Sequence, residues 1–322
     1  MHTDSISALC AAMERSGIPP QRLRRDAPMR SYTSFRIGGP ADLLLETGDP
    51  EEIRRSILLC GELQIPLTLI GNGSNLLVRD GGIRGLVLRV AGQSAEPSIL
   101  EETGGCTRLS VSAAVTLAQL AAYACARGLA GLAELSGIPG TLGGGAIMNA
   151  GAYGGELAQV ITRVEALSLA SGSPHIYEGS SLGFSYRHSA MAEDGVAVIR
   201  AELLLPHEHP EMIRARMNEL AAQRREKQPL EYPSAGSTFK RPQGAFAAKL
   251  IDDCGLRGLS VGGAQVSEKH AGFVINRGGA TARDVLSLMA LVQQRVQEAT
   301  GFLLEPEIRI LGEDRAPEGE PA

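Results

Sequence analysis

The five cysteines of this 322-residue sequence show none of the spacings by which cysteines bind metals. There is no CxxC motif, and no two cysteines stand in the paired arrangement of a zinc site. Scattered cysteines of this kind are typical of a protein kept in a reducing cytosol, and we expect no metal. They are Cys10, Cys60, Cys106, Cys125 and Cys254.

The sequence also lacks a strong charge imbalance and a long apolar segment. Its 31 basic and 36 acidic residues are intermixed, with a net charge of −5, which argues against a broad nucleic-acid or membrane surface. The most apolar long segment, residues 113–132, contains Gln119 and Arg127, short of the roughly 20 apolar residues that span a membrane. Asp4 stands where a secretion signal would be basic. We expect a cytoplasmic protein that binds neither nucleic acid nor membrane, and we take it to be a monomer.

The hydrophobic pattern that is present mixes strand and helix periods and predicts an α+β protein. We divide the chain into residues 1–92, 93–206 and 207–312. A polar tail, residues 313–322, is expected to be disordered. Asp49, Thr116 and Thr281 are good N-caps for helices over residues 51–60, from 117 to Gly128, and 281–299.

The loop GNGSN, residues 71–75, lies between two apolar runs. Glycines let a backbone approach an anion and point N–H groups at it. Nucleotide-binding loops usually precede a helix or end in Gly-Lys-Ser/Thr, but here a strand pattern follows and no lysine is present. Taken alone, the loop is therefore either a β-turn or a phosphate cradle built from amides and the Ser74 and Asn75 side chains.

Residues 136–156 hold eight glycines and cannot be regular structure throughout. Ordering so many glycines is entropically costly, so such a loop is kept where a backbone must pass close to something flat or anionic, with Asn149 available as an amide partner. A flexible lid or a crowded packing corner is the other reading.

Three further stretches hold groups that could act in a reaction. Arg187, in FSYRHS, could clamp a carboxylate or phosphate. Ser237, in PSAGSTFKRP, could donate a proton, and no Gly-x-Ser-x-Gly elbow surrounds it, which argues against a serine hydrolase. Glu305 and Glu307 alternate with apolar neighbours in a predicted strand over 306–311 and would share one face. Each stretch also has an ordinary structural reading as a turn or a solvated edge.

Together and in this order, these stretches resemble the UDP-N-acetylenolpyruvoylglucosamine reductases. The similar motifs are TSFRIGG (33–39), GNGSNLLVRDGG (71–82), LSGIPGTLGGGAIMNAGAYGGE (135–156), FSYRHS, PSAGSTFK and LEPEIRILG. The resemblance implies a fold with two FAD-binding subdomains of the vanillyl-alcohol-oxidase (PCMH) type, 1–92 and 93–206, and a substrate domain, 207–312. It implies FAD and NADPH as cofactors and a UDP-sugar as substrate.

The resemblance also implies roles for single residues. Arg187 would be a catalytic arginine, Ser237 the proton donor and Glu307 the second catalytic acid, while Tyr186 and Lys227 would hold the substrate. The residues implied to bind FAD are Gly71, Asn72, Gly73, Ser74, Asn75, Gly140, Gly143, Gly144, Asn149 and Gly151.

The implied reaction reduces FAD with NADPH and passes the hydride to the enolpyruvyl group of UDP-N-acetylglucosamine enolpyruvate, giving UDP-N-acetylmuramate for peptidoglycan. Two alternatives stay open at this point. One is another FAD-dependent oxidase or dehydrogenase of the same fold, acting on a small hydroxy acid or alcohol. The other is a non-catalytic nucleotide-binding protein, which would keep the glycine loops without needing Arg187, Ser237 and Glu307 together.

Overall fold

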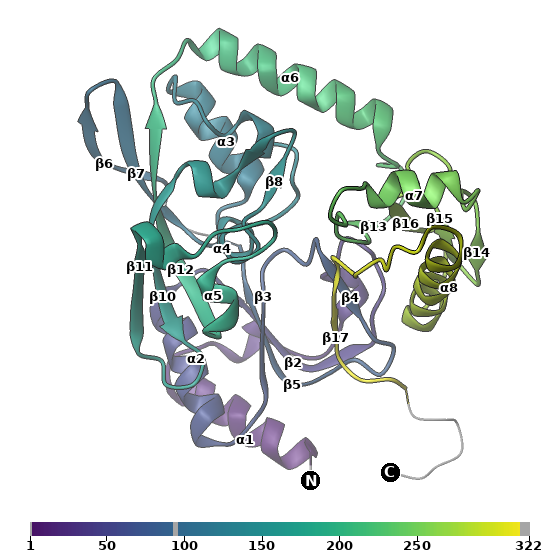
Figure 1. Cartoon of the computed structure of the whole chain (residues 1–322). Coiled ribbons are helices and arrows are strands. Elements are labelled where there is room, and N and C mark those ends of the chain that lie inside the picture. Colours follow the sequence, from purple (N-terminus) through teal and green to yellow (C-terminus); the bar gives the residue numbers. More distant parts are fainter. Residues whose placement is uncertain (1, 93–95, 316–322) are drawn as a thin grey trace. The chain divides into compact units, whose positions relative to one another are not determined.

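The computed structural model describes residues 2–92 and 96–315 of the chain (Figure 1). They form two compact units that alternate along the sequence. Unit 1 comprises the residues up to Arg24, Leu43–Asn72 and Gly85–Arg224, and unit 2 comprises Arg25–Asp42, Gly73–Arg84 and the described residues from Arg225 onward. The three consecutive domains expected from the sequence remain a prediction.

The N-terminal sheet has four strands in the order β1-β2-β5-β3, with β3 parallel to β5. The strands are β1 (Leu23–Pro28), β2 (Pro40–Thr47), β5 (Ile83–Val90) and β3 (Leu67–Ile70). Helices α1 (His2–Arg15) and α2 (Pro50–Glu62) pack against one another (Figure 1). As predicted, Asp49 caps α2, and its carboxylate accepts from the backbone N–H groups of the first turn.

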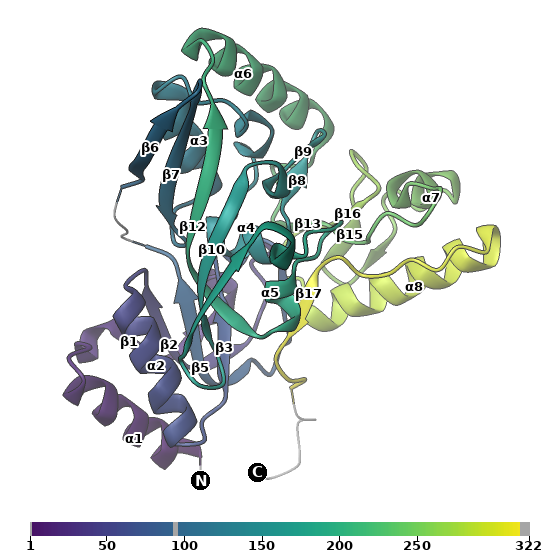
Figure 2. The same ribbon diagram turned by 60° about the vertical axis from the view of Figure 1, so that its left-hand side comes forward.

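The second sheet, in unit 1, has five antiparallel strands in the order β11-β10-β12-β7-β6, several of which stand side by side in Figure 2. They are β6 (Ser98–Thr103), β7 (Cys106–Ser112), β10 (Ile161–Ser168), β11 (Pro174–Glu178) and β12 (Val196–Pro206). Helix α3 (Leu117–Ala126) starts at the predicted cap, Thr116, which forms a reciprocal capping box with Gln119.

The glycine-rich segment contains more regular structure than its composition predicts. Leu142–Ile147 form a helix, α4, and Gly151–Ala152 and Gly155–Glu156 form a small hairpin, β8 and β9. The glycines serve close packing, because a Cβ atom on Gly143 would lie 2.8 Å from the Ala113 Cβ and one on Gly145 would lie 2.9 Å from Leu157. Tertiary packing therefore overrides the low helix propensity of glycine here.

Two more helices follow, α5 within unit 1 and α6, most of which belongs to unit 1. Helix α5 covers Ala190–Glu193, and α6 covers Pro210–Lys227. The 3₁₀ turns among the described residues of both units are Pro20–Arg22, Met29–Ser31, Ala133–Leu135, Leu157–Gln159 and Gly179–Leu182.

Unit 2 is built on an antiparallel sheet with the order β13-β16-β15-β14. Its strands are β13 (Ser234–Ser237), β14 (Ser260–Val261), β15 (Ala264–Val266) and β16 (Phe273–Asn276). Helices α7 (Ala247–Asp253) and α8 (Ala282–Thr300) contact one another, and α8 packs on β14 and β15 (Figure 1). As predicted, Thr281 caps α8, and its Val285, Leu288, Met289 and Val292 are buried.

The final strand is shorter than predicted. β17 covers only Arg309–Leu311 and pairs in parallel with β4 (Leu76–Val78). Glu305 and Glu307 therefore precede this strand, and the prediction that they share a face of it was wrong. Glu313, in the segment expected to be disordered, exchanges backbone hydrogen bonds of 2.9 Å with Gly81 and Gly82. Residues 316–322 lie outside the described residues.

The described residues contain no membrane-spanning helix, no metal-binding cluster and no disulfide. None of the helices is long and apolar enough to cross a membrane. Among the same residues, no group of three or more His, Cys, Asp and Glu side chains could hold a metal ion. All five cysteines are free thiols.

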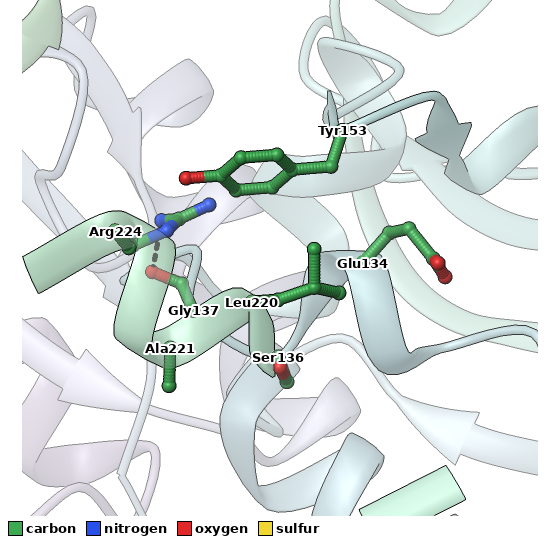
Figure 3. A pocket seen from close by; sticks show the side chains of 7 residues that line it. All are labelled: Glu134, Ser136, Gly137, Tyr153, Leu220, Ala221 and Arg224. Atoms are coloured by element: carbon green, nitrogen blue, oxygen red, sulfur yellow. Dashed lines mark hydrogen bonds between the residues drawn. The ribbon is translucent and has the colours of Figure 1, made fainter. Parts of the chain in front are cut away.

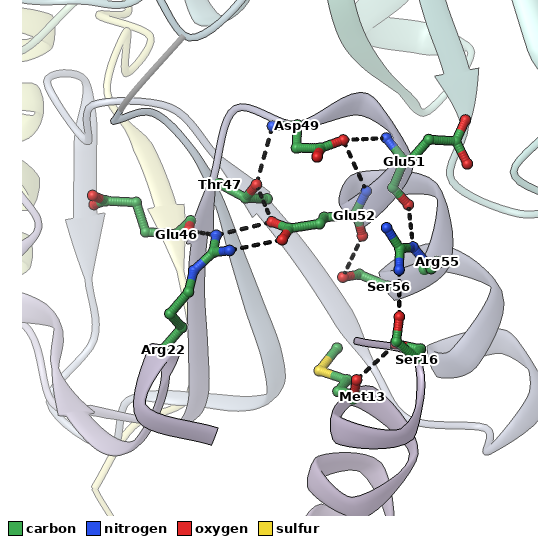
Figure 4. A network of polar contacts seen from close by, with 10 residues as sticks. All are labelled: Met13, Ser16, Arg22, Glu46, Thr47, Asp49, Glu51, Glu52, Arg55 and Ser56. Carbon is green, nitrogen blue, oxygen red and sulfur yellow. Dashed lines mark hydrogen bonds and ion pairs between the residues drawn. The ribbon is translucent and has the colours of Figure 1, made fainter. Parts of the chain in front are cut away.

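A buried carboxylate, Glu52, ties α2 to the strand before it (Figure 4). Arg22 donates two hydrogen bonds to it, 2.7 Å and 2.8 Å long, and the Thr47 hydroxyl donates a third of 2.5 Å. The same guanidinium also donates to the Glu46 carbonyl at 2.9 Å. Because each donor is fixed by the others, the network orients α2 as well as satisfying the carboxylate.

Glu52→Ala is expected to lower the thermal midpoint of the FAD-loaded protein by several degrees. Removing the carboxylate leaves the Arg22 guanidinium and the Thr47 hydroxyl without their acceptor, which costs about 2 kcal/mol because Arg22 is partly exposed. Glu51→Ala, at an exposed position of the same helical turn, is the matched control and should change the midpoint little. Equal shifts for the two variants would contradict a structural role for the network.

Candidate functional site

The loop GNGSN connects β3 to β4, so a strand follows it, as the sequence predicted. Two of its glycines lie against neighbouring chain too closely for any side chain. A Cβ atom on Gly73 would stand 2.1 Å from the Tyr32 carbonyl oxygen, and Gly73 has a φ of +66°. A Cβ atom on Gly71 would stand 2.7 Å from the Thr141 hydroxyl. The loop is therefore a tightly held run of backbone, with Gly73 itself buried.

The amides of this loop are available to a ligand. Outside the strand ladders, none of the backbone N–H groups of residues 71–75 donates to another described residue. Exposed or half-buried N–H groups of successive small residues are the donors from which proteins build anion sites. These N–H groups could therefore bind a pyrophosphate, as the phosphate-cradle interpretation of the loop requires.

Asn72 uses its side chain to hold the loop in place. Its Nδ2 donates to the Pro139 carbonyl at 2.7 Å, and its Oδ1 accepts from Arg89 at 2.7 Å. Arg89 in turn forms an ion pair with Glu46. Asn72 thus joins the loop to the start of the glycine-rich segment within unit 1.

Hydrogen bonds within the glycine-rich segment and to the chain at Ala113 and Leu117 hold it in place. Gly140 is buried and its carbonyl accepts from the Leu117 N–H at 3.0 Å. Thr141 caps α4 by accepting from Gly144 at 3.4 Å, while Gly143 donates to the Ala113 carbonyl at 2.9 Å. These bonds exclude the flexible-lid reading for residues 140–147.

Arg224, which the sequence did not single out, fixes the other part of this segment (Figure 3). It lies on α6, donates to the Gly137 carbonyl and stands 5.6 Å from the centre of the Tyr153 ring. Burial lowers the pKa of Arg224 from its ordinary value, but the group remains a cation. A neighbouring ion pair, Arg216 with Glu134 at 3.1 Å, also joins α6 to this region. A basic residue on a charged helix gives no signal of such a contact in the sequence.

Arg187 lies in a tight turn beside the end of the glycine-rich segment. Its φ is +56°, a left-handed conformation that is uncommon for a non-glycine residue and that often marks functional sites. Its guanidinium donates to the Gly151 carbonyl at 3.1 Å and stands 5.1 Å from the centre of the Tyr186 ring. Tyr186 is 51% exposed, so this arginine–tyrosine pair is accessible at the surface of unit 1.

In unit 2, the chain just after Ser237 pairs with the chain at Glu307. Ser237 ends β13 after an irregularity of register that includes Gly236, with a φ of +81°, and its side chain is exposed. The next residue, Thr238, accepts a 2.8 Å hydrogen bond from the Glu307 N–H. A second bond of 2.8 Å, from the Lys240 N–H to the Glu305 carbonyl, continues this antiparallel pairing. The segment after Ser237 therefore runs beside the segment that carries Glu307.

Asn75 lies against the same segment. Its Nδ2 donates to the Glu307 carbonyl at 3.1 Å, and its carbonyl accepts from the Arg309 N–H at 2.9 Å. The end of the GNGSN loop is thus attached directly to the chain around Glu307.

Lys227, which the family resemblance implies in substrate binding, is exposed at the C-terminal end of α6.

Comparison with known proteins identifies the family. Residues 41–176 match the FAD binding domain family, and residues 228–311 match the C-terminal domain of UDP-N-acetylenolpyruvoylglucosamine reductase. A reductase of that name from Syntrophomonas wolfei is 45% identical over 297 residues, covering 92% of this chain and 97% of the relative. The chain belongs to this reductase family. The corresponding reductase from Agathobacter rectalis is 48% identical over 303 residues, covering 92% of this chain and 96% of that protein.

A solved structure agrees with this assignment. The reductase from Thermus caldophilus superposes with a TM-score of 0.74 at 37% identity, covering 90% of this chain and 98% of that one. The expected α+β FAD-binding fold and the expected FAD-dependent oxidoreductase class are therefore confirmed. The match to the reductase C-terminal domain includes Ser237 and Glu307, and the match to the FAD binding domain includes residues 71–75 and 140–151.

Proposed function

We propose that this reductase converts UDP-N-acetylglucosamine enolpyruvate to UDP-N-acetylmuramate, using NADPH and enzyme-bound FAD, in the synthesis of peptidoglycan precursors. The observation that carries the site assignment is the antiparallel pairing of the chain after Ser237 with the chain at Glu307. The residues that carry the hydroxyl and the carboxyl group implied by the family resemblance therefore lie in or next to adjacent, paired segments of one unit. Support for the reaction itself comes from family membership over almost the whole chain.

FAD is assigned to the two glycine-rich stretches. The backbone amides of Gly71, Asn72, Gly73, Ser74 and Asn75, with the Ser74 hydroxyl, would bind the pyrophosphate, because these amides have no backbone partner outside the strand ladders among the described residues. The Asn72 and Asn75 side chains would hold the loop itself in shape. The segment that contains Gly140, Gly143, Gly144, Asn149 and Gly151 would lie along the cofactor.

Bound FAD would supply the redox chemistry, which is net hydride transfer from NADPH to the terminal carbon of the enolpyruvyl group. Negative charge then develops on the neighbouring carbon and in its carboxylate. Arg187 and Glu307, the latter in its protonated form, would donate hydrogen bonds that stabilise this charge as it forms, where preorganised donors have their largest effect. Ser237 donates its proton to the carbon, which is basic enough to accept it when the two groups are held in fixed geometry. Lys227 and Tyr186 hold the substrate.

The decisive experiment uses the purified, FAD-loaded protein under anaerobic conditions. NADPH should bleach the visible flavin spectrum, and addition of UDP-N-acetylglucosamine enolpyruvate should restore it within one turnover. Product is identified as UDP-N-acetylmuramate by mass spectrometry. If the flavin stays reduced with this substrate, the reductase activity is refuted, and rapid reoxidation by oxygen after reduction with a small hydroxy acid or alcohol would instead support an oxidase.

The monomeric state and the cytoplasmic location remain predictions from the sequence. Size-exclusion chromatography with light scattering tests the first directly. A mass near 33.9 kDa is expected for a single chain.

A further inference from the structure

We infer that Asn149 is a positioning residue for Arg187, and that it holds the turn on which the arginine lies rather than contacting the cofactor with its side chain. The inference rests on the proposed role of Arg187 in the substrate half-reaction. Asn149 belongs to the glycine-rich segment, and its side chain bonds to the protein backbone. All of the contacts involved lie within unit 1.

The Asn149 side-chain amide is enclosed and hydrogen-bonded at both its nitrogen and its oxygen. The residue is 0% exposed. Its Nδ2 donates to the Ser185 carbonyl at 3.0 Å, and its Oδ1 accepts from the Ala158 N–H at 2.9 Å. A buried amide with partners at both ends is held firmly, because breaking either bond would leave an unsatisfied polar group.

The contact with Ser185 is one of three that join two short segments of chain. Two residues beyond Asn149, the Gly151 carbonyl accepts from the Arg187 guanidinium at 3.1 Å. Two residues before it, the Ile147 carbonyl accepts from the buried Ser189 hydroxyl at 2.8 Å. Residues 147–151 and 185–189 are therefore connected at three points, and Asn149 provides the central one.

The turn that carries Arg187 needs such support. Ser185 and His188 exchange backbone hydrogen bonds of 3.1 Å and 3.2 Å, which close a turn with Arg187 at a φ of +56°. A left-handed conformation is unfavourable for arginine, so it persists only where the surrounding contacts determine it. Asn149 itself has a φ of +42°, a conformation that asparagine tolerates better than most residues. The Ser185 carbonyl, at the start of the turn, is the atom that Asn149 fixes.

The test replaces Asn149 with aspartate and measures the two half-reactions of the FAD-loaded enzyme separately. Asn149→Asp preserves the shape and the acceptor for Ala158, but it sets an oxygen in place of the amide donor to Ser185. Reoxidation by UDP-N-acetylglucosamine enolpyruvate should slow by about 10- to 100-fold, because a small displacement of a reacting group has effects of this size. The rate of flavin reduction by NADPH should stay within about twofold of the wild-type value, because only the substrate half-reaction depends on the position of Arg187. The spectrum of the bound flavin should be unchanged.

A second buried asparagine provides the matched control. Asn276, in unit 2, also donates to a carbonyl, that of Phe35 at 3.3 Å, and accepts from the Gly278 N–H at 3.0 Å. Asn276→Asp should lower thermal stability in the same way but leave the ratio of the two half-reaction rates unchanged. This control separates loss of stability from displacement of Arg187.

Each outcome decides the question. Wild-type reoxidation by Asn149→Asp, or equal slowing of both half-reactions, overturns the inference, and loss of FAD would make Asn149 a cofactor-site residue instead. If that variant does not fold, Ser189→Ala removes a neighbouring link of the same clamp, and a wild-type reoxidation rate there also overturns it. Arg187→Lys distinguishes the underlying proposal, because an unaffected reoxidation rate in that variant would refute the role of Arg187 itself.

Discussion

Ser237→Ala is expected to leave flavin reduction by NADPH nearly unchanged while slowing flavin reoxidation by UDP-N-acetylglucosamine enolpyruvate by about 10²- to 10⁴-fold, the range typical of a lost general acid. A methyl group has no proton to give, so the carbon that has received the hydride would depend on water. Ser237 is exposed at the end of β13, so the substitution opens no cavity and the fold should be retained.

The two rates are measured by stopped-flow spectroscopy of the flavin without oxygen. Ser260→Ala is the matched control, since Ser260 is an exposed serine in the same four-stranded sheet. Its hydroxyl donates to the Gly258 carbonyl at 3.0 Å and accepts from the Gln265 side chain at 3.1 Å. This variant should leave both rates unchanged. Equal decreases of both rates in Ser237→Ala would make Ser237 a structural residue and would remove the proton donor from the mechanism.

The parts of the fold that could be predicted from the sequence depend on local interactions. Asp49, Thr116 and Thr281 cap their helices as predicted, because a capping side chain bonds only to the next few residues. Helix α4 was missed for the opposite reason. Its glycines are poor helix formers, and the packing against Ala113 and Leu157 that favours them comes from distant parts of the chain.

In the candidate site, the sequence likewise indicated which residues matter but not which residues they contact. The sequence drew attention to Asn75 and Asn149 as polar groups in glycine loops, and the family resemblance added Asn72. Their partners stand 232, 36 and 67 residues away, at Glu307, Ser185 and Pro139. Contacts over such separations depend on the folded chain. Only the structure could show that these three amides bind the protein's own backbone.

Gly73→Ala is expected to yield a folded protein that has lost most of its FAD. The new Cβ atom would lie 2.1 Å from the Tyr32 carbonyl oxygen, a backbone atom, so either Tyr32 or the loop must move. Movement would also break the 3.1 Å hydrogen bond from the Ser34 N–H to the Gly73 carbonyl. A distortion of about 3 kcal/mol at the pyrophosphate loop corresponds to roughly 100-fold weaker FAD binding. Titration of the apoprotein with FAD, followed by flavin fluorescence, measures this change.

Gly104→Ala separates the steric clash from the cost of a left-handed backbone. Gly104 lies in the turn between β6 and β7 with a φ of +58°, close to that of Gly73, but a Cβ atom there would meet nothing within 4 Å. Both variants carry the conformational penalty of alanine at positive φ, about 1–2 kcal/mol, and only Gly73→Ala carries the clash. FAD affinity should therefore be unchanged in Gly104→Ala. If Gly73→Ala also binds FAD with wild-type affinity, the loop does not hold the pyrophosphate, and the cofactor must be bound elsewhere in the chain.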